Sequence, residues 1–229
     1  MLSRCRSAWL ALAVLCAPAL HAQVPPSAAD VAAFGPLHAA AHQGDAARLA
    51  AALAGGAAIN GRAAHGRTAL HVATFARRRD AIAQLARAGA ELGAFDEDRY
   101  DAVTIAAVAG DEGTLGVLLT LGASAKLMTS RYDGTALIAA AHLGHDGVVR
   151  QLIQAGAPLD HVNNLHWTAV IEAIVLGDGG PRHQACLRAL VDAGANIALR
   201  DRSGQTPLQL ARARGFDAMV RILEGAPKR

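Results

Sequence analysis

Aromatic, charged and cysteine residues are all scarce in this chain of 229 residues. Aromatic side chains make up 3% of it and charged ones 18%, whereas hydrophobic residues make up 52%. This apolar fraction excludes an intrinsically disordered chain, and the length allows one large domain or two small ones. Because alanine is abundant and β-branched residues are few, we expect close-packed short helices rather than a β-sandwich.

No hydrophobic run approaches the roughly 20 residues that a membrane-spanning helix needs. An apolar run from Ala8 to Ala19 follows Arg4 and Arg6 and ends in small residues. A basic start, a short apolar core and a small-residue exit predict a secretory signal peptide over residues 1–22, cleaved after Ala22. Cleavage after Ala19, a retained anchor and a lipid on Cys16 remain alternatives. After cleavage we expect a periplasmic or secreted protein with no stable membrane anchor.

Removing residues 1–22 changes the charge and the cysteine count. The remaining chain carries 20 basic and 19 acidic residues, and its single cysteine is Cys186. It therefore cannot form an intramolecular disulfide. With a net charge near zero and only one short basic run, Arg77-Arg78-Arg79, it is not expected to bind nucleic acid.

A repeat with a period of about 33 residues runs through the rest of the chain. Its first marker is a leucine-like position in strings such as Thr68-Ala69-Leu70-His71. This position recurs at Leu37, Leu70, Val103, Leu137, Val170 and Leu208, with intervals of 33, 33, 34, 33 and 38 residues. A second marker, Gly-Ala, recurs at residues 56, 89, 122, 156 and 194 with the same irregularities. Two markers that keep step indicate a stacked repeat architecture.

These strings resemble the ankyrin repeat, and the best copy begins at Asp201 and continues through Thr206-Pro207-Leu208. The resemblance implies an all-α solenoid of about six helix-turn-helix units joined by β-hairpin-like finger loops. We assign residues 23–29 to a linker, residues 30–226 to the repeats and residues 227–229 to a tail. The unit boundaries are about 30–59, 60–92, 93–126, 127–159, 160–197 and 198–226.

Local chemistry agrees with these units. The threonines can cap each first helix, and a glycine such as Gly56 can end each second helix in the left-handed conformation. Alanines such as Ala73 mark places where two helices press together. His38 and His71 stand where the family uses an imidazole to brace the turn. Three units depart from the pattern: Arg99 replaces a glycine, residues 127–132 hold one extra residue, and five extra residues lie around 177–183, between two helices.

The resemblance implies that a partner protein binds to the finger loops and to the concave face of the first helices. We therefore expect a non-enzymatic interaction protein, an inhibitor, scaffold or protective partner of an exported enzyme, that is monomeric and needs no cofactor. The proposed protein-binding residues are Arg62, His65, Phe75, Phe95, Tyr100, Val108, Arg131, Tyr132, His142, Leu143, His166, Trp167 and Val175. Arginine and aromatic side chains are favoured at interfaces, and apolar residues in place of charge suggest one.

Two other functions remain open. The glycine-rich insertion 177–183 could cradle a phosphate, or be a longer loop between helices. His142 and His145 have a spacing that can share a metal, and Glu172 lies nearby in the stack, which would suit a small-molecule, metal or catalytic site. We name no catalytic and no metal residue, because no hydrolase or zinc-protease motif is present and Cys186 lies on an apolar helix. A purely structural spacer is the third possibility.

Overall fold

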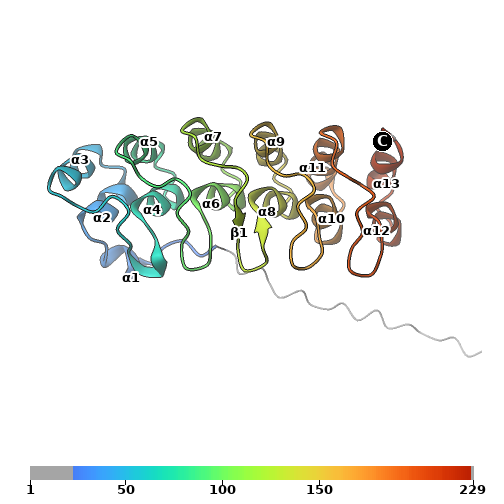
Figure 1. Cartoon of the computed structure of the whole chain (residues 1–229), viewed down its shortest axis with the longest axis horizontal. Coiled ribbons are helices and arrows are strands. Elements are labelled where there is room, and N and C mark those ends of the chain that lie inside the picture. Colours follow the sequence, from blue (N-terminus) through green and yellow to red (C-terminus); the bar gives the residue numbers. More distant parts are fainter. Residues whose placement is uncertain (1–22, 228–229) are drawn as a thin grey trace, which may run out of the picture.

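A computed structural model describes residues 23–227, which form a row of helix pairs (Figure 1). The first helices of the pairs are α2 (Pro36–Gln43), α4 (Ala69–Phe75), α6 (Ala102–Val108), α8 (Ala136–His142), α10 (Ala169–Val175) and α12 (Pro207–Ala213). The second helices are α3 (Ala46–Ala54), α5 (Arg79–Arg87), α7 (Glu112–Thr120), α9 (Asp146–Gln154), α11 (Pro181–Asp192) and α13 (Asp217–Glu224). We number these pairs as repeats 1 to 6. A short helix, α1 (Ala28–Ala32), precedes them.

The finger loops join each pair to the next and lie at the lower edge of Figure 1. The loop before α4 contains a 3₁₀ turn, η1 (Ala64–Gly66), with His65 in the left-handed region. The loop before α8 is a hairpin of β1 (Met128–Thr129) and β2 (Gly134–Thr135), which pair antiparallel with Met128 opposite Thr135. This strand pair takes up the extra residue of the fourth unit, so the predicted hairpin-like finger is a true ladder there.

Caps and terminators follow the sequence prediction closely. Thr135, Thr168 and Thr206 accept a hydrogen bond from the third residue of α8, α10 and α12, and Asp101 does the same for α6. The marker glycines that follow the second helices of repeats 1 to 5, at positions 56, 89, 122, 156 and 194, have positive φ, from 77° to 93°, where a side chain is disfavoured. Gly225, which ends α13, has a φ of −81°. Each repeat is therefore bounded by its own local chemistry.

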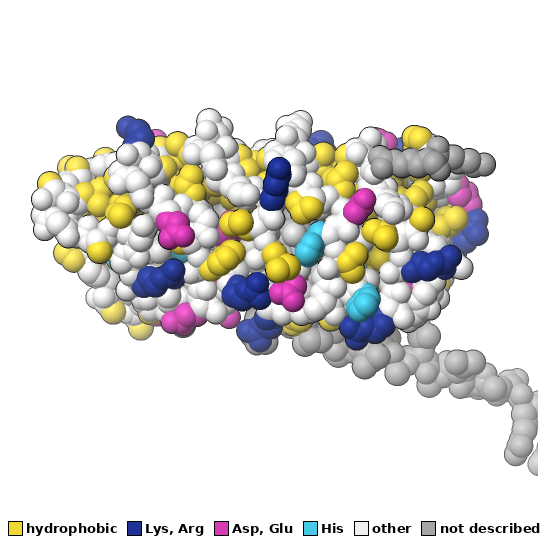
Figure 2. Space-filling view, viewed as in Figure 1, with side chains coloured by type: hydrophobic (Ala, Val, Ile, Leu, Met, Phe, Trp, Pro, Cys, Tyr) yellow, Lys and Arg dark blue, Asp and Glu magenta, His cyan; other side chains and the backbone are white. Residues whose placement is uncertain are grey.

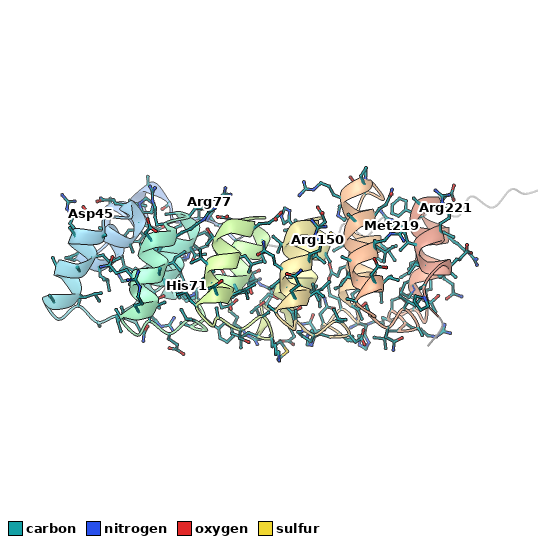
Figure 3. All side chains as sticks on the ribbon, turned by 90° about the horizontal axis from the view of Figure 1, so that it is seen from above. Asp45, His71, Arg77, Arg150, Met219 and Arg221 are labelled. Carbon is teal, nitrogen blue, oxygen red and sulfur yellow. The ribbon has the colours of Figure 1, made fainter. Side chains whose placement is uncertain are left out.

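Packing explains the alanine excess. Each first helix contacts its own second helix and the first helices on either side, and the second helices contact one another in a row (Figure 3). Alanines lie at the first-helix contacts and are at most 1% exposed, at positions 40, 73, 107, 140 and 173. Leucine and isoleucine fill the space between the rows, as in Leu115, Leu152 and Leu187. One repeat alone could not bury these faces, but neighbours in a stack can.

Two irregular units differ from what the sequence suggested. Arg99 adopts a φ of 63° at the glycine position, so the third finger keeps the ordinary turn instead of an altered one. The insertion of the fifth unit was predicted to lie between the helices, but part of it lengthens a helix. α11 has 12 residues where α5, α7 and α9 have 9, and Pro181 begins it at a position that needs no N–H donor. His183 consequently lies inside α11.

Candidate binding surface

The predicted concave column lies at the carboxyl ends of the first helices. Phe75, Val108, His142 and Val175 are half-buried, and Leu143 is 39% exposed. Val175 packs against the core, and the Arg67 guanidinium lies 4.6 Å from the centre of the Phe75 ring. The column is therefore a partly covered apolar strip, and Leu143 is its most exposed large apolar side chain.

The fingers share one turn, which the side chain of its first residue closes. The first residue's N–H donates to the carbonyl of the fifth, at residues 63, 96, 163 and 201. Oδ1 of Asp96, Asn163 and Asp201 also accepts hydrogen bonds from the N–H groups two and four residues later. Ala63 has no such side chain. This device makes most fingers preorganised, which lowers the entropy cost of binding to them.

Neighbouring fingers are joined to one another by backbone hydrogen bonds. The N–H groups of Glu97, Ser130 and Asn164 donate to carbonyls of the preceding finger, at His65, Arg99 and Tyr132. The fingers therefore form a continuous edge along the molecule rather than separate loops.

Several predicted binding residues take part in these connections. Arg62 donates from Nη1 to the carbonyls of Gly66 and Phe95, and the Arg131 side chain forms an ion pair with Asp98 at 3.4 Å. The Tyr100 carbonyl accepts a hydrogen bond from His71, and burial raises the pKa of the Tyr100 phenol. These contacts order the predicted surface, and each also has a structural role.

The remaining predicted residues differ in exposure. His65 and His166 are exposed at positive φ, whereas Tyr132 is half-buried and its carbonyl accepts from Asn164. Trp167 is half-buried against the core, so it packs within the stack and presents only part of its ring.

Two buried charged groups lie under the column, one in each half of the molecule. Arg67 is 5% exposed; its Nη2 donates to the Val24 carbonyl at 2.5 Å, and its Nε lies 3.9 Å from Asp96 Oδ2. The sequence pattern did not single it out, although it stands at the same place in its finger as Tyr100 and Trp167. The available signal was that Arg67 is the one charged residue at a position held elsewhere by Phe34, Tyr100, Gly134, Trp167 and Gln205.

Glu172 is the buried charge of repeat 5 and is 3% exposed. Its Oε1 accepts a hydrogen bond of 2.9 Å from Asn163 Nδ2, and its Oε2 lies 3.3 Å from Nδ1 of His142 in the preceding repeat. The predicted proximity of Glu172 and His142 is confirmed. A protonated His142 would form an ion pair with this carboxylate, so the pair joins repeats 4 and 5.

Several histidines outside this pair have structural partners. His38 bonds through Nε2 to the Arg67 carbonyl, and His71 bridges Thr68 and the Tyr100 carbonyl, as predicted for turn bracing. Burial lowers the pKa of His71 to about 4. His145 contacts the Val108 carbonyl with Nε2 and Arg182 with Nδ1. Among residues 23–227, no group of three or more His, Cys, Asp or Glu side chains is placed to hold a metal ion.

The insertion of repeat 5 packs against repeat 6. Asp178 accepts hydrogen bonds from Gly180 N and His183 Nδ1, and Arg214 donates to the Gly177 carbonyl. A Cβ on Gly179 would lie 2.5 Å from the Phe216 ring. The loop is therefore folded onto its neighbour, as the interpretation of a longer inter-helix loop requires.

The basic run 77–79 also connects repeats. Arg77 and Arg79 form ion pairs with Asp111 at 3.5 and 3.1 Å, and Arg78 donates to the His42 carbonyl. On the face drawn in Figure 2, charges of both signs are interspersed. Cys186 is fully buried, and burial raises the pKa of its thiol to about 12, so it is an unreactive core residue, as expected. No helix within residues 23–227 combines the length and apolar character that crossing a membrane requires.

Comparison with known proteins gives consistent matches. A family model described as ankyrin repeats, in three copies, matches residues 103–201. The Escherichia coli protein YahD, described as an ankyrin repeat protein, is 33% identical over 188 residues, which cover 82% of this chain and 93% of YahD. An ankyrin repeat domain from Acinetobacter baumannii is 43% identical, with a TM-score of 0.79, covering 83% of this chain and 97% of that one. The ankyrin repeat domain of Bcl-3, a member of the IkappaB protein family, is 26% identical with a TM-score of 0.74. This match covers 85% of this chain and 88% of the Bcl-3 domain.

Proposed function

The chain belongs to the ankyrin-repeat family, whose repeats generally mediate protein–protein interaction, and from this premise we propose that it is a non-enzymatic binding protein of the periplasm. In this role it binds one exported protein along the concave column and the adjoining fingers. The partner is an exported enzyme that it inhibits, scaffolds or protects.

The observation that carries this proposal is the strip formed by Val108, Leu143 and Val175 beside an edge of joined fingers. Apolar side chains lie at the solvent-facing ends of first helices, and Leu143 keeps 39% of its surface exposed. An apolar strip bordered by arginine and aromatic residues on an ordered backbone has the composition of a protein interface. The buried Glu172 carboxylate, next to the half-buried His142, adds a charged group that can select among partners.

The periplasmic location is supported by the composition of residues 1–22, which lie outside the described part of the chain. A basic start, an apolar run of 12 residues and small residues before Gln23 are typical of an exported precursor. Cell fractionation and N-terminal sequencing test it: we expect a periplasmic protein that begins at Gln23. A cytoplasmic protein that retains Met1 or Leu2 would contradict it.

Affinity capture from periplasmic extract tests the binding surface. Leu143→Asp places a charge on the strip, and Ala47→Asp, on the exposed side of α3, is the matched control with the same charge change. We expect the intact chain and the control to capture the same protein and Leu143→Asp to lose at least nine-tenths of it. If Leu143→Asp captures as much as the control, this strip is not the binding surface.

A further inference from the structure

Part of the concave face is already covered by the chain itself. Residues 23–34, which we call the leader, lie over repeats 1 and 2, where α1 adjoins the first-helix row (Figure 1). The Val24 carbonyl accepts from Arg67, and Asp30 lies 3.8 Å from His65 of the second finger. The Phe34 ring lies about 6 Å from the rings of His38 and His42 in α2. The leader therefore contacts both components of the predicted binding face, a finger and the column.

The leader is held weakly compared with the repeats. α1 has only five residues and none of them is buried, and Val24 is 68% exposed. No residue of the leader belongs to the hydrophobic core or packs against it. Isolated helices of this length are not stable in water, so a few contacts at Val24, Asp30 and Phe34 hold the segment. We therefore expect that this segment can leave while the hydrophobic core stays intact.

Arg67 is built to receive an acceptor from outside the repeats. Its guanidinium is buried between the Phe75 ring and Asp96, but the nearest carboxylate oxygen is 3.9 Å from Nε, and Nε has no hydrogen-bond partner within the described chain. A buried guanidinium requires hydrogen-bond acceptors, and the Val24 carbonyl is the one that the leader supplies. Whatever replaces the leader must bring an equivalent oxygen.

The conformation of the leader beside Arg67 indicates which kind of segment can bind there. Pro25 and Pro26 restrict the main chain to an extended course next to Val24, and Ser27 is also extended, with φ −69° and ψ 166°. The side chain of Val24 points to solvent for the most part, so Arg67 recognises a main-chain carbonyl rather than a side chain. The contact therefore selects for an extended, proline-containing segment.

We propose that the leader is a built-in occupant of the concave face at repeats 1 and 2, and that the partner displaces it with an extended, proline-containing segment whose main-chain carbonyl binds Arg67. This inference rests on the proposed function, since it names the chemistry of the partner at the same face. Because the leader is tethered, it competes at an effective concentration on the order of millimolar. Partner binding is thereby restricted to segments that outcompete it.

A labelled peptide with the sequence of residues 23–34, carrying fluorescein after Phe34, tests the proposal by fluorescence polarisation. It is titrated with the full chain and with the full chain carrying Asp30→Ala and Phe34→Ala, which loosen the tethered leader. We expect the loosened chain to bind the peptide at least tenfold more tightly than the intact chain. Adding Arg67→Met to the loosened chain abolishes this binding.

Controls separate recognition from misfolding. Circular dichroism and Tm establish that the Arg67→Met chain is folded. A second peptide, with both prolines replaced by glycine, tests the preference for proline without any change to the protein. We expect that peptide to bind the loosened chain at least threefold more weakly. Equal affinity of the intact and loosened chains, or no binding to the loosened chain, overturns the proposal. If capture still depends on Leu143 in that case, the proposed function stands and the leader is only an end cap.

Discussion

The two halves of the concave face differ in what covers them and in the charge buried beneath. Over repeats 1 and 2 the leader lies on the face and the buried group is the Arg67 guanidinium, which holds the Val24 carbonyl. In repeats 4 and 5 Leu143 is exposed and the buried group is the Glu172 carboxylate, held by Asn163. The buried group of repeats 1 and 2 therefore needs hydrogen-bond acceptors, and that of repeats 4 and 5 needs hydrogen-bond donors. The leader supplies an acceptor to the first group only.

Because the leader does not cover repeats 4 and 5, we expect the stability of these repeats to depend most on the hydrogen bonds within them. Asn163→Ala removes the donor to Glu172 and the acceptor for the N–H groups of Leu165 and Trp167. Leaving a buried carboxylate and two backbone donors unpaired is expected to cost about 2–4 kcal/mol of unfolding free energy and to lower Tm by about 5–12 °C.

The adjacent Asn164 is the matched control for this change. It is exposed, and its Nδ2 donates only to the Arg131 carbonyl, so Asn164→Ala is expected to cost less than about 1 kcal/mol. Thermal unfolding of both variants measures the contrast. Equal losses would show that Asn163 does no more than close its turn.

The stability of repeats 1 and 2, which the leader covers, is expected to be more sensitive to acid than that of repeats 4 to 6. The bracing imidazoles occur only in repeats 1 and 2, as His38 and His71, whereas repeats 4 to 6 have Ile138, Ile171 and Gln209 at the same position. His71 Nδ1 accepts the Thr68 N–H, so it must be neutral, and burial lowers the pKa of both histidines.

The sign of the pH effect follows from these shifts. A folded-state pKa below that of the unfolded chain gives stability that is present at pH 7 and is lost as the pH falls from about 6.5 toward 4. For His71 the loss at pH 5 is about 2 kcal/mol. In repeat 3, burial raises the pKa of Asp96 and Asp101, which opposes the effect there, because their protonation favours the folded state.

Amide hydrogen exchange at pH 7 and pH 5, corrected for intrinsic rates, measures this difference repeat by repeat. We expect α2 and α4 to lose protection at pH 5 before α10 and α12, and His71→Gln to reduce the change in α4. A uniform loss along the stack would remove the distinction between the halves. His145, whose pKa is also lowered by burial, provides an internal reference in repeat 4.

Much of the fold follows from the sequence because its determinants are local. The Thr68 and Thr168 strings and the glycines at 56 and 89 each act within one turn of a helix, so spacing alone places them. The turn-bracing role of His71 was expected from the resemblance to the ankyrin repeat, and its first partner, Thr68, is three residues away.

What the sequence did not reveal depends on contacts between distant residues. Arg67 is buried by contacts with the Phe75 ring, Asp96 and Val24, and Val24 lies 43 residues earlier in the chain. The partial covering of the Phe75 column has the same origin, because Arg67 lies on that ring. Pro181 begins α11 by a local rule, but the close approach of Gly179 to Phe216 joins residues far apart in the chain, so local patterns do not reveal it.

The smallest predicted effect concerns the one finger that lacks the shared side-chain acceptor. Ala63 stands at the position of Asp96, Asn163 and Asp201. Its N–H donates to the Arg67 carbonyl at 2.8 Å, but the Arg67 N–H makes a long contact of 3.4 Å to the Ala64 carbonyl instead of bonding to a side-chain oxygen. Ala63→Asp supplies an oxygen for the N–H groups of His65 and Arg67, by analogy with the other fingers, and places a carboxylate in a finger that carries two arginines. We expect a gain of about 0.5–1 kcal/mol and a Tm higher by about 1–4 °C. Ala64→Asp, exposed and one residue later, adds the same charge without the acceptor geometry and should change Tm by less than half as much. If the two variants change Tm equally, the effect comes from the added charge alone, and the side-chain closure of the turn contributes nothing to stability.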